Sequence, residues 1–199
     1  MNRRLLLGLP LLGAGCSVLP DRPFLESQRF ALEPRRAGPP GRRTRQALLL
    51  RSMRAAPGLE LRGLRRVQAD GRVEVAPYEE WLAPPADLTE LALRQWLVAS
   101  GRFTAVTSPG SRLATTLILE TELLILQIDG GLARAAVAAL LLTQGGGLGD
   151  PRPLGQTTVE AQIPLSAAAN ASAQAAAMQA ALGRVLADLE SWLVSAISV

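Results

Sequence analysis

The sequence predicts an α+β fold in which a mainly antiparallel sheet is covered on one face by two helices. Short apolar segments separated by turn residues indicate strands. Two Asp-Gly pairs, Asp70-Gly71 and Asp129-Gly130, lie between apolar segments and favour tight hairpin turns, which join antiparallel neighbours. Two longer segments repeat their apolar residues at helical spacing. The chain has 199 residues, of which 48% are hydrophobic, and this length suits one domain with its own core.

Four strands are predicted before the first helix. Residues 28–32 form a candidate edge strand, and residues 46–51 form a short apolar strand. Residues 59–67 and 72–78 flank Asp70-Gly71, so we expect them to pair with each other as a hairpin.

Four more strands are predicted in the second half. They cover residues 103–106, 115–128, 132–142 and 156–163. In the longest of them, Glu120 and Glu122 share one alternating face, and the other face carries Leu117, Leu119, Leu123 and Ile125. Residues 132–142 are ambiguous, because their alanines favour a helix while their place after Asp-Gly favours the returning arm of a hairpin. We predict a strand there.

The two helices are bounded by recognisable end signals. Asp87 and Glu90 match a capping box, which predicts a helix that begins at Asp87 and stops at Gly101. The second helix begins after Ser166 or Asn170, either of which can cap it, and runs to the end of the chain. Its apolar stripe consists of Leu182, Val185, Leu186, Leu189, Trp192, Leu193, Ala196 and Ile197.

The first residues are typical of an export signal. Two arginines, Arg3 and Arg4, precede a short apolar run that contains a proline and is too short to span a bilayer. Small residues then lead to Cys16, the only cysteine. We therefore predict a signal peptide over residues 1–15, a tether over residues 16–26, and a single domain over residues 27–199. An ordinary signal peptide followed by an incidental thiol is the alternative.

The site around Cys16 resembles the lipobox of bacterial lipoproteins, although Gly13 replaces the usual aliphatic residue and Leu12 lies one position earlier. The resemblance implies that the thiol receives a diacylglyceryl group and that the new amine is acylated after cleavage. Several acyl chains would hold the protein firmly at a membrane. Ser17 resembles the sorting signal for the outer membrane.

The charge balance argues against nucleic acid as a partner. All 21 basic residues are arginines, 17 residues are acidic, and loss of Arg3 and Arg4 with the leader leaves a net charge of +2. Nucleic-acid binders usually carry a concentrated basic field with a recognition element. Residues 35–66 hold ten arginines and one acid, Glu60. This block could contact anionic head groups, or it could be an ordinary solvated surface of an arginine-rich chain.

Chemistry-bearing motifs are scarce. The chain has no histidine, which excludes Ser-His-Asp and Cys-His nucleophile systems and leaves no zinc ligand set. The glycines of residues 145–149 are followed by Asp-Pro and do not form a P-loop. The carboxylate pairs Glu79-Glu80 and Glu120/Glu122 lie on faces expected to be solvated. We predict a binding or structural role with no catalytic residue, no metal, and no cofactor apart from the lipid on Cys16.

One segment is more specific. A strand ending in Tyr78 is followed by Trp81, by Pro84-Pro85 at the entry to a helix, and by Ser-Gly-Arg-Phe at residues 100–103. This order resembles the auxiliary lipoproteins of ABC-type transport systems (PqiC-like), as does the turn at residues 55–59. The resemblance covers essentially the whole chain. Leu82 departs from the alanine that the family mostly has after Trp, and the loop around Gly145 is unusually rich in glycine.

The resemblance implies an accessory lipoprotein that faces the periplasm from the outer membrane. Its partners would be an MCE-domain protein, a permease and an ATPase that together move lipids between the two membranes. We expect a ring-like homo-oligomer that docks on the MCE protein, with Tyr78, Trp81, Pro84 and Pro85 as candidate contacts. Alternatively, Tyr78 and Trp81 only fix the strand to the helix. A rival function is a lipoprotein that itself carries an acyl chain between the sheet and the helices.

Overall fold

The computed structural model describes residues 25–144, 150–166 and 168–197. In chain order the elements are β1 (Gln28–Phe30), β2 (Ala47–Leu50), β3 (Arg54–Ala55), β4 (Gly63–Val67), β5 (Val73–Trp81), α1 (Pro85–Ala99), β6 (Ala105–Thr107), β7 (Leu117–Asp129), β8 (Leu132–Thr143), β9 (Arg152–Pro164) and α2 (Ala171–Ile197). The strands form one nine-stranded mixed sheet. None of the described helices is long and apolar enough to cross a membrane.

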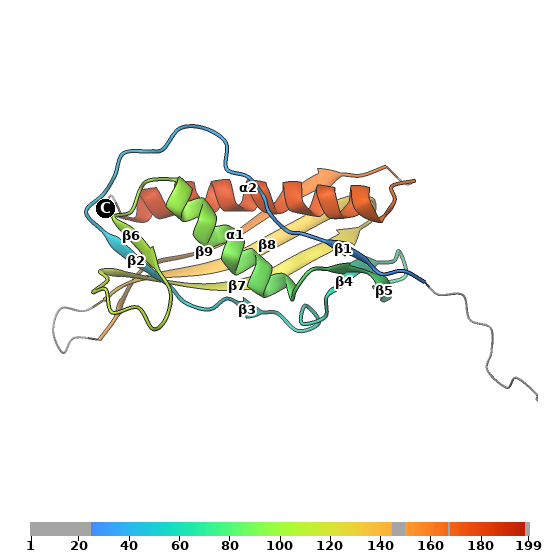
Figure 1. Ribbon diagram of the computed structural model, residues 1–199, viewed down its shortest axis with the longest axis horizontal. Coiled ribbons are helices and arrows are strands. Elements are labelled where there is room, and N and C mark those ends of the chain that lie inside the picture. Colours follow the sequence, from blue (N-terminus) through green and yellow to red (C-terminus); the bar gives the residue numbers. More distant parts are fainter. Residues whose placement is uncertain (1–24, 145–149, 167, 198–199) are drawn as a thin grey trace, which may run out of the picture.

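The sheet is organised around the long strand β7. β8 pairs antiparallel along its whole length on one side. On the other side, β2, β3 and β4 follow one another along β7 in the parallel direction, with Leu48 opposite Leu117, Arg54 opposite Glu122, and Arg66 opposite Ile128. Residues 47–67 thus act as one interrupted strand beside β7 (Figure 1).

The prediction of a mainly antiparallel sheet is wrong. Among the described residues, five of the eight strand pairings are parallel and three are antiparallel. The antiparallel hairpins were predicted from local turn residues, and these turns are present. The parallel pairings join segments far apart in sequence, because α1 lies between β5 and β6 and the chain returns through it to run beside β2.

Both Asp-Gly turns form hairpins, by two different geometries. The β4–β5 turn has hydrogen bonds from Gly71 N to Gln68 O and from Gln68 N to Arg72 O, and Gly71 has a φ of 82°. This is a three-residue loop that ends in a left-handed residue. In the β7–β8 turn, Gly130 and Gly131 both have positive φ, as a two-residue type I′ loop requires.

Residues 132–143 are a strand, as predicted, but the faces of β7 differ from the prediction. The β7–β8 register shifts between Leu123 and Ile125, so a bulge reverses the alternation after Leu123. Leu126, only 1% exposed, therefore takes the core position that was predicted for Ile125. Periodicity alone does not reveal a bulge of this kind.

The start of α1 differs from the predicted capping box. The helix begins at Pro85, whose ring suits the first helical position, and Pro84 before it has no side-chain acceptor with which to cap the helix. Glu90 instead accepts a hydrogen bond from Met53 N at 3.0 Å. The helix ends before Gly101, whose φ is 63°. For α2, Asn170 is the cap, since its Oδ1 accepts a bond from Ala173 N at 2.9 Å.

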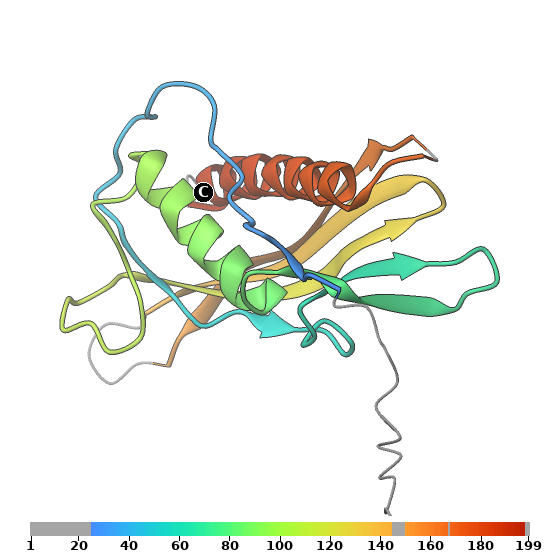
Figure 2. The same cartoon turned by 45° about the vertical axis from the view of Figure 1, so that its right-hand side comes forward.

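Both helices lie on the same face of the sheet (Figures 1 and 2). α2 packs on β8 and β9, and α1 packs on β7. Alanines on the core face of β8 meet alanines of α2, which lets helix and sheet approach closely. One contiguous cluster of buried side chains fills the space between the two layers.

Residues 31–46, which we call the strap, run from β1 over the helices to β2 (blue in Figure 1). Two of the backbone N–H groups that fix the strap bind α2 and the residue after α1. Glu33 N donates to Gln179 Oε1 of α2 at 3.0 Å, and Gly41 N donates to Ser100 O after α1 at 2.8 Å. The strap is thus bound to both helices.

Candidate functional site

The surface predicted for partner binding is built on an irregularity in β5. Gly63 lies opposite Glu80, but Arg65 already lies opposite Val75, so β5 carries three extra residues between these points. A Cβ atom at Gly63 would lie 2.3 Å from the carbonyl oxygen of Ala76. The absence of a side chain at residue 63 therefore lets the irregular part of β5 pass close to β4.

The four predicted contact residues differ in exposure. Trp81 is 1% exposed and belongs to the core, and Pro85 is buried at the start of α1. Pro84 is half-buried, whereas Tyr78 is 46% exposed. Among these four, Tyr78 alone presents a large side chain to solvent. Trp81 belongs to the buried core cluster and anchors the end of β5 there.

Two exposed leucines near Tyr78 were not predicted. Leu82 is 57% exposed and Leu61 is 61% exposed. The β4–β5 register, extended by the 2.7 Å bond from Trp81 N to Arg62 O, brings Leu61 and Leu82 opposite each other. The available signal was Leu82 itself, which departs from the alanine usual in the family. Leu82 follows Tyr78 by four residues in the chain, and an exposed apolar pair of this kind suits a protein contact.

The acidic residues of this region are engaged in ion pairs. Glu80 lies 2.9 Å from Arg29 of β1 and 3.3 Å from Arg62, and Glu79 is paired with Arg66. The carboxylate pair Glu79-Glu80 therefore binds β1 to β5 and supports the β4–β5 hairpin. Its geometry is that of a structural network.

A buried carboxylate, Glu190 of α2, joins the strap to both helices. Glu190 is 8% exposed. Arg36 of the strap binds both its oxygens, with Nε 2.8 Å from Oε2 and Nη2 3.1 Å from Oε1. Trp96 of α1 donates its indole N–H to Oε2 at 2.9 Å. Arg102 is 3.6 Å from Oε1, a charge contact without a hydrogen bond. We call these four residues the Glu190 cluster.

The cluster holds the carboxyl group ionised despite its burial. Desolvation is the largest influence and by itself raises the pKa of Glu190, but the hydrogen bonds from Arg36 and Trp96 and the nearby charges outweigh it, so the pKa lies below its ordinary value. The hydrogen bond to Glu190 raises the pKa of Arg36. Both groups are therefore charged at neutral pH, and the strap is fixed by a bidentate ion pair.

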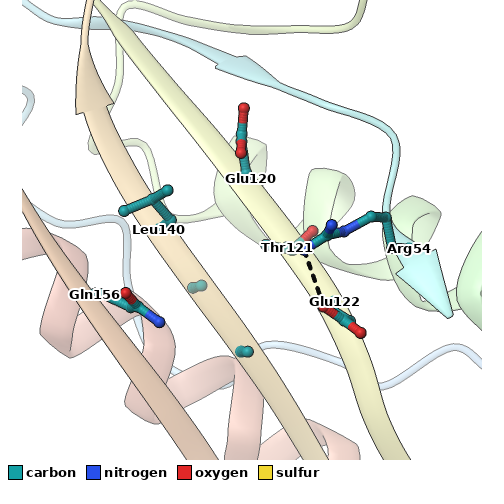
Figure 3. Close-up of a pocket in the computed structure, with 8 residues that line it drawn as sticks. Arg54, Glu120, Thr121, Glu122, Leu140 and Gln156 are labelled. Carbon is teal, nitrogen blue, oxygen red and sulfur yellow. Dashed lines mark hydrogen bonds and ion pairs between the residues drawn. The ribbon is translucent and has the colours of Figure 1, made fainter. Parts of the chain in front are cut away.

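The second predicted carboxylate pair lies on the sheet face opposite the helices, at a depression of about 140 Å³ (Figure 3). Glu122 accepts a bond from Arg54 Nη2 at 3.0 Å, and Glu120 accepts one from Arg51 at 2.8 Å. These pairs attach the β2–β3 segment to β7. The depression is smaller than ordinary ligand pockets.

Three predictions remain: the lipid anchor at Cys16, the absence of a metal, and the space for an acyl chain in the rival function. Cys16 lies outside the described residues. The described residues contain no group of three or more His, Cys, Asp or Glu side chains that could hold a metal ion. One contiguous cluster of buried side chains lies between the sheet and the helices, where the rival function would place an acyl chain.

Comparison with solved structures shows which proteins share this fold. A protein from Xanthomonas campestris, XCC0632, has 21% identity and a TM-score of 0.72, over 86% of this chain and 97% of that chain. The Chlamydia trachomatis hypothetical protein CT253 has 9% identity and a TM-score of 0.53, over 76% and 99%. These likenesses show a shared α/β fold. No curated protein matches the chain.

The family follows from the sequence. Residues 30–190 match the model of the ABC-type transport auxiliary lipoprotein component. The match covers more than half of the chain, and the chain belongs to this family. The predicted family is thereby confirmed, and the protein is an auxiliary lipoprotein component of an ABC-type transport system.

Proposed function

We propose that the chain is a lipid-anchored, non-catalytic accessory subunit of an MCE-linked lipid transport system. In this proposal Cys16 carries the lipid, the anchor lies in the outer membrane, and the domain faces the periplasm and docks on the MCE-domain protein as a ring-like oligomer. The family match over residues 30–190 carries the proposal, because the family is that of an auxiliary component of ABC-type transport.

The geometry supports docking over catalysis. The clustered carboxylates that sequence patterns put forward are paired with arginines and serve to join strands, as Glu80 and Glu122 illustrate. Catalytic acids and bases are instead usually placed with pKa values tuned to accept or donate protons. A rigid scaffold that exposes Tyr78, Leu61 and Leu82 suits recognition of another protein.

The anchor is tested by metabolic labelling. We expect the chain expressed with radioactive palmitate to be labelled and to sediment with outer membranes. The Cys16→Ala variant should carry no label and keep its leader. An unlabelled wild-type chain would contradict the anchor and, with it, the placement at the membrane.

The docking surface is tested by co-purification in mild detergent. We expect the tagged chain to retain the MCE-domain protein, and the variant Tyr78→Ser/Leu82→Ser to retain at least tenfold less. The matched control Leu91→Ser/Val98→Ser changes two side chains of similar exposure, 46% and 61%, on α1. Equal loss in both variants, or no MCE protein with the wild type, would refute the surface or the docking role.

Two further measurements separate the proposal from its rival. Native mass spectrometry of the Cys16→Ala chain should show no retained lipid, whereas an acyl carrier would keep one. Mass photometry of the wild-type chain should show an oligomer, and a monomer at micromolar concentration would contradict the ring.

A further inference from the structure

The arginines of this chain are unevenly distributed with respect to its acids. Residues 34–59 and 91–119 together contain ten arginines and no aspartate or glutamate. Protein surfaces generally intersperse the two signs of charge. Most of the strap, together with β2 and β3, belongs to the first of these segments, and most of α1, β6 and the start of β7 belong to the second.

The fold brings the two segments together at one end of the sheet. Thr44 N donates to Arg102 O at 2.7 Å, and Arg43 Nη2 donates to Thr104 O at 3.1 Å. Thr116, just before β7, donates its hydroxyl to Gln46. The β8–β9 register adds Arg152, which lies opposite Thr143, itself opposite Leu117.

Five arginines are presented at this end, and all five are exposed. They are Arg42, Arg43 and Arg45 at the end of the strap, Arg112 in the β6–β7 connection, and Arg152 at the start of β9. We call this set the basic end.

Five of the other six arginines in the acid-free segments have an acidic partner, and the sixth, Arg35, is exposed. Arg36 and Arg102 are neutralised by Glu190, and Arg51, Arg54 and Arg94 each have a glutamate partner. No carboxylate in the described part of the chain lies within ion-pair distance of the five arginines of the basic end. In the segments that form this end, Asp150 is the one described acid. The basic end therefore carries charge that the domain does not use itself.

The tether joins the domain near the opposite end (Figure 1). Gln28, the first residue of β1, lies opposite Glu79, and the neighbouring Glu80 lies opposite Gly63. Arg66 lies opposite Ile128 of β7, so Gly63, three residues earlier, lies at the height of residue 125 along that strand. Ala47, just after the strap, binds Thr116, so the end of the strap lies at the height of residue 116. Nine residues of strand separate the two levels by about 30 Å.

The length of the tether limits how the domain can face its membrane. Residues 16–27 span at most about 40 Å when fully extended. They reach a bilayer easily from the end where β1 begins, but the basic end comes to the same bilayer only if the tether is stretched back along the whole domain. With the anchor proposed at Cys16, the tether therefore favours an arrangement in which the basic end points away from the anchoring membrane.

We propose that the basic end binds an acidic surface of a partner protein. This inference rests on the proposed function for the anchor and for docking, and it adds the chemistry of the partner. Guanidinium groups bind carboxylates through two parallel hydrogen bonds, and Arg43 is held in place by Thr104. Complementary charge of this kind speeds encounter and makes binding fall with salt.

The direct test measures binding of a fluorescein-labelled dodecaglutamate peptide to the full chain in mild detergent. We expect salt-sensitive binding that is at least tenfold weaker in Arg42→Glu/Arg43→Glu/Arg45→Glu. The control Arg35→Glu/Arg72→Glu/Arg184→Glu makes the same change of charge at exposed arginines outside the basic end and should bind within threefold of the wild type. Equal binding by the two variants would overturn the proposal. Circular dichroism checks that both fold, and glutamine replacements serve if a glutamate variant does not.

A second arm separates an acidic protein from anionic lipid. The wild-type chain is anchored in phosphatidylcholine vesicles with or without phosphatidylglycerol, and trypsin cleavage after residues 42–45 is timed. We expect rates that agree within twofold. More than tenfold protection by phosphatidylglycerol would show that head groups cover this end, and would overturn the protein partner.

Peptide binding and co-purification of the MCE protein can fail independently of each other. Peptide binding that depends on the basic end, without a co-purified MCE protein, would refute the proposed function and leave the inference standing. If the MCE protein co-purifies but the peptide binds equally to the basic-end variant and its control, the inference is refuted and the proposed function stands.

Discussion

Replacing Glu190 by glutamine should loosen the strap, and the structure allows the cost to be gauged. The Glu190 and Arg36 side chains are only 10% and 12% exposed, so the change leaves a largely buried guanidinium without its counter-charge. Removing one partner of a buried pair costs about 3–5 kcal/mol. Because glutamine can still accept the Trp96 indole bond and the strap can open to water, we expect about 3 kcal/mol, the lower value of that range.

The assay is urea unfolding of the folded domain followed by tryptophan fluorescence. A loss of about 3 kcal/mol should lower the melting temperature by about 6–12 °C for a domain of this size. Glu160→Gln is the matched control, since its pair with Arg134 is 38% and 26% exposed and should contribute about 1 kcal/mol or less.

A double-mutant cycle completes this test. Arg36→Met removes the charge that Glu190→Gln leaves unpaired, so the double variant should be less destabilised than the sum of the two single variants. Hydrogen exchange should show faster opening of residues 31–46 in Glu190→Gln. Equal stability of Glu190→Gln and Glu160→Gln, within about 0.5 kcal/mol, would refute the role assigned to the cluster.

Other variants should change stability in defined directions. Gly63→Ala should cost about 2 kcal/mol in urea unfolding, because its Cβ would lie 2.3 Å from the Ala76 carbonyl oxygen. Gly183→Ala, inside α2, should instead stabilise by about 0.5–1 kcal/mol, since its Cβ would meet Pro34 at an ordinary 3.5 Å and alanine favours the helix; a loss would contradict this. The pKa of Glu190 is lowered in the folded state, so its contribution is present above the ordinary carboxyl pKa and is lost as pH falls through the folded value. Unfolding free energy should therefore fall below about pH 4.5, less steeply in Glu190→Gln, and identical acid profiles would count against the cluster.

Local sequence signals predicted the elements well and their long-range pairing poorly. The hairpin turns at Asp70-Gly71 and Gly130-Gly131 formed because glycine supplies the positive φ that these loops need. No comparable local signal indicates that residues 47–67 lie beside β7, since this contact depends on how the core closes. The parallel pairings were missed for that reason.

At the candidate site, too, the local order of residues could be predicted, but burial and long-range contacts could not. The aromatic residues of the Tyr78–Trp81 segment were found from their order in the sequence, but only the structure shows that Trp81 is buried and Tyr78 is exposed. In the sequence, Glu190 is one acid beside the apolar stripe of the second helix, and no motif marks it as part of a site. Its role depends on Arg36, 154 residues earlier, which no spacing rule connects to it.

The placement of residues 47–67 beside β7 has a consequence for how the protein matures. Ala47 finds its partner 69 residues later in the chain, and Arg54 finds its partner 68 residues later. A polypeptide that emerges with its amino end first leaves these strands unpaired until most of the domain has followed. Contacts so distant in sequence slow folding, and we expect the two sides of β7 to be completed together at a late step.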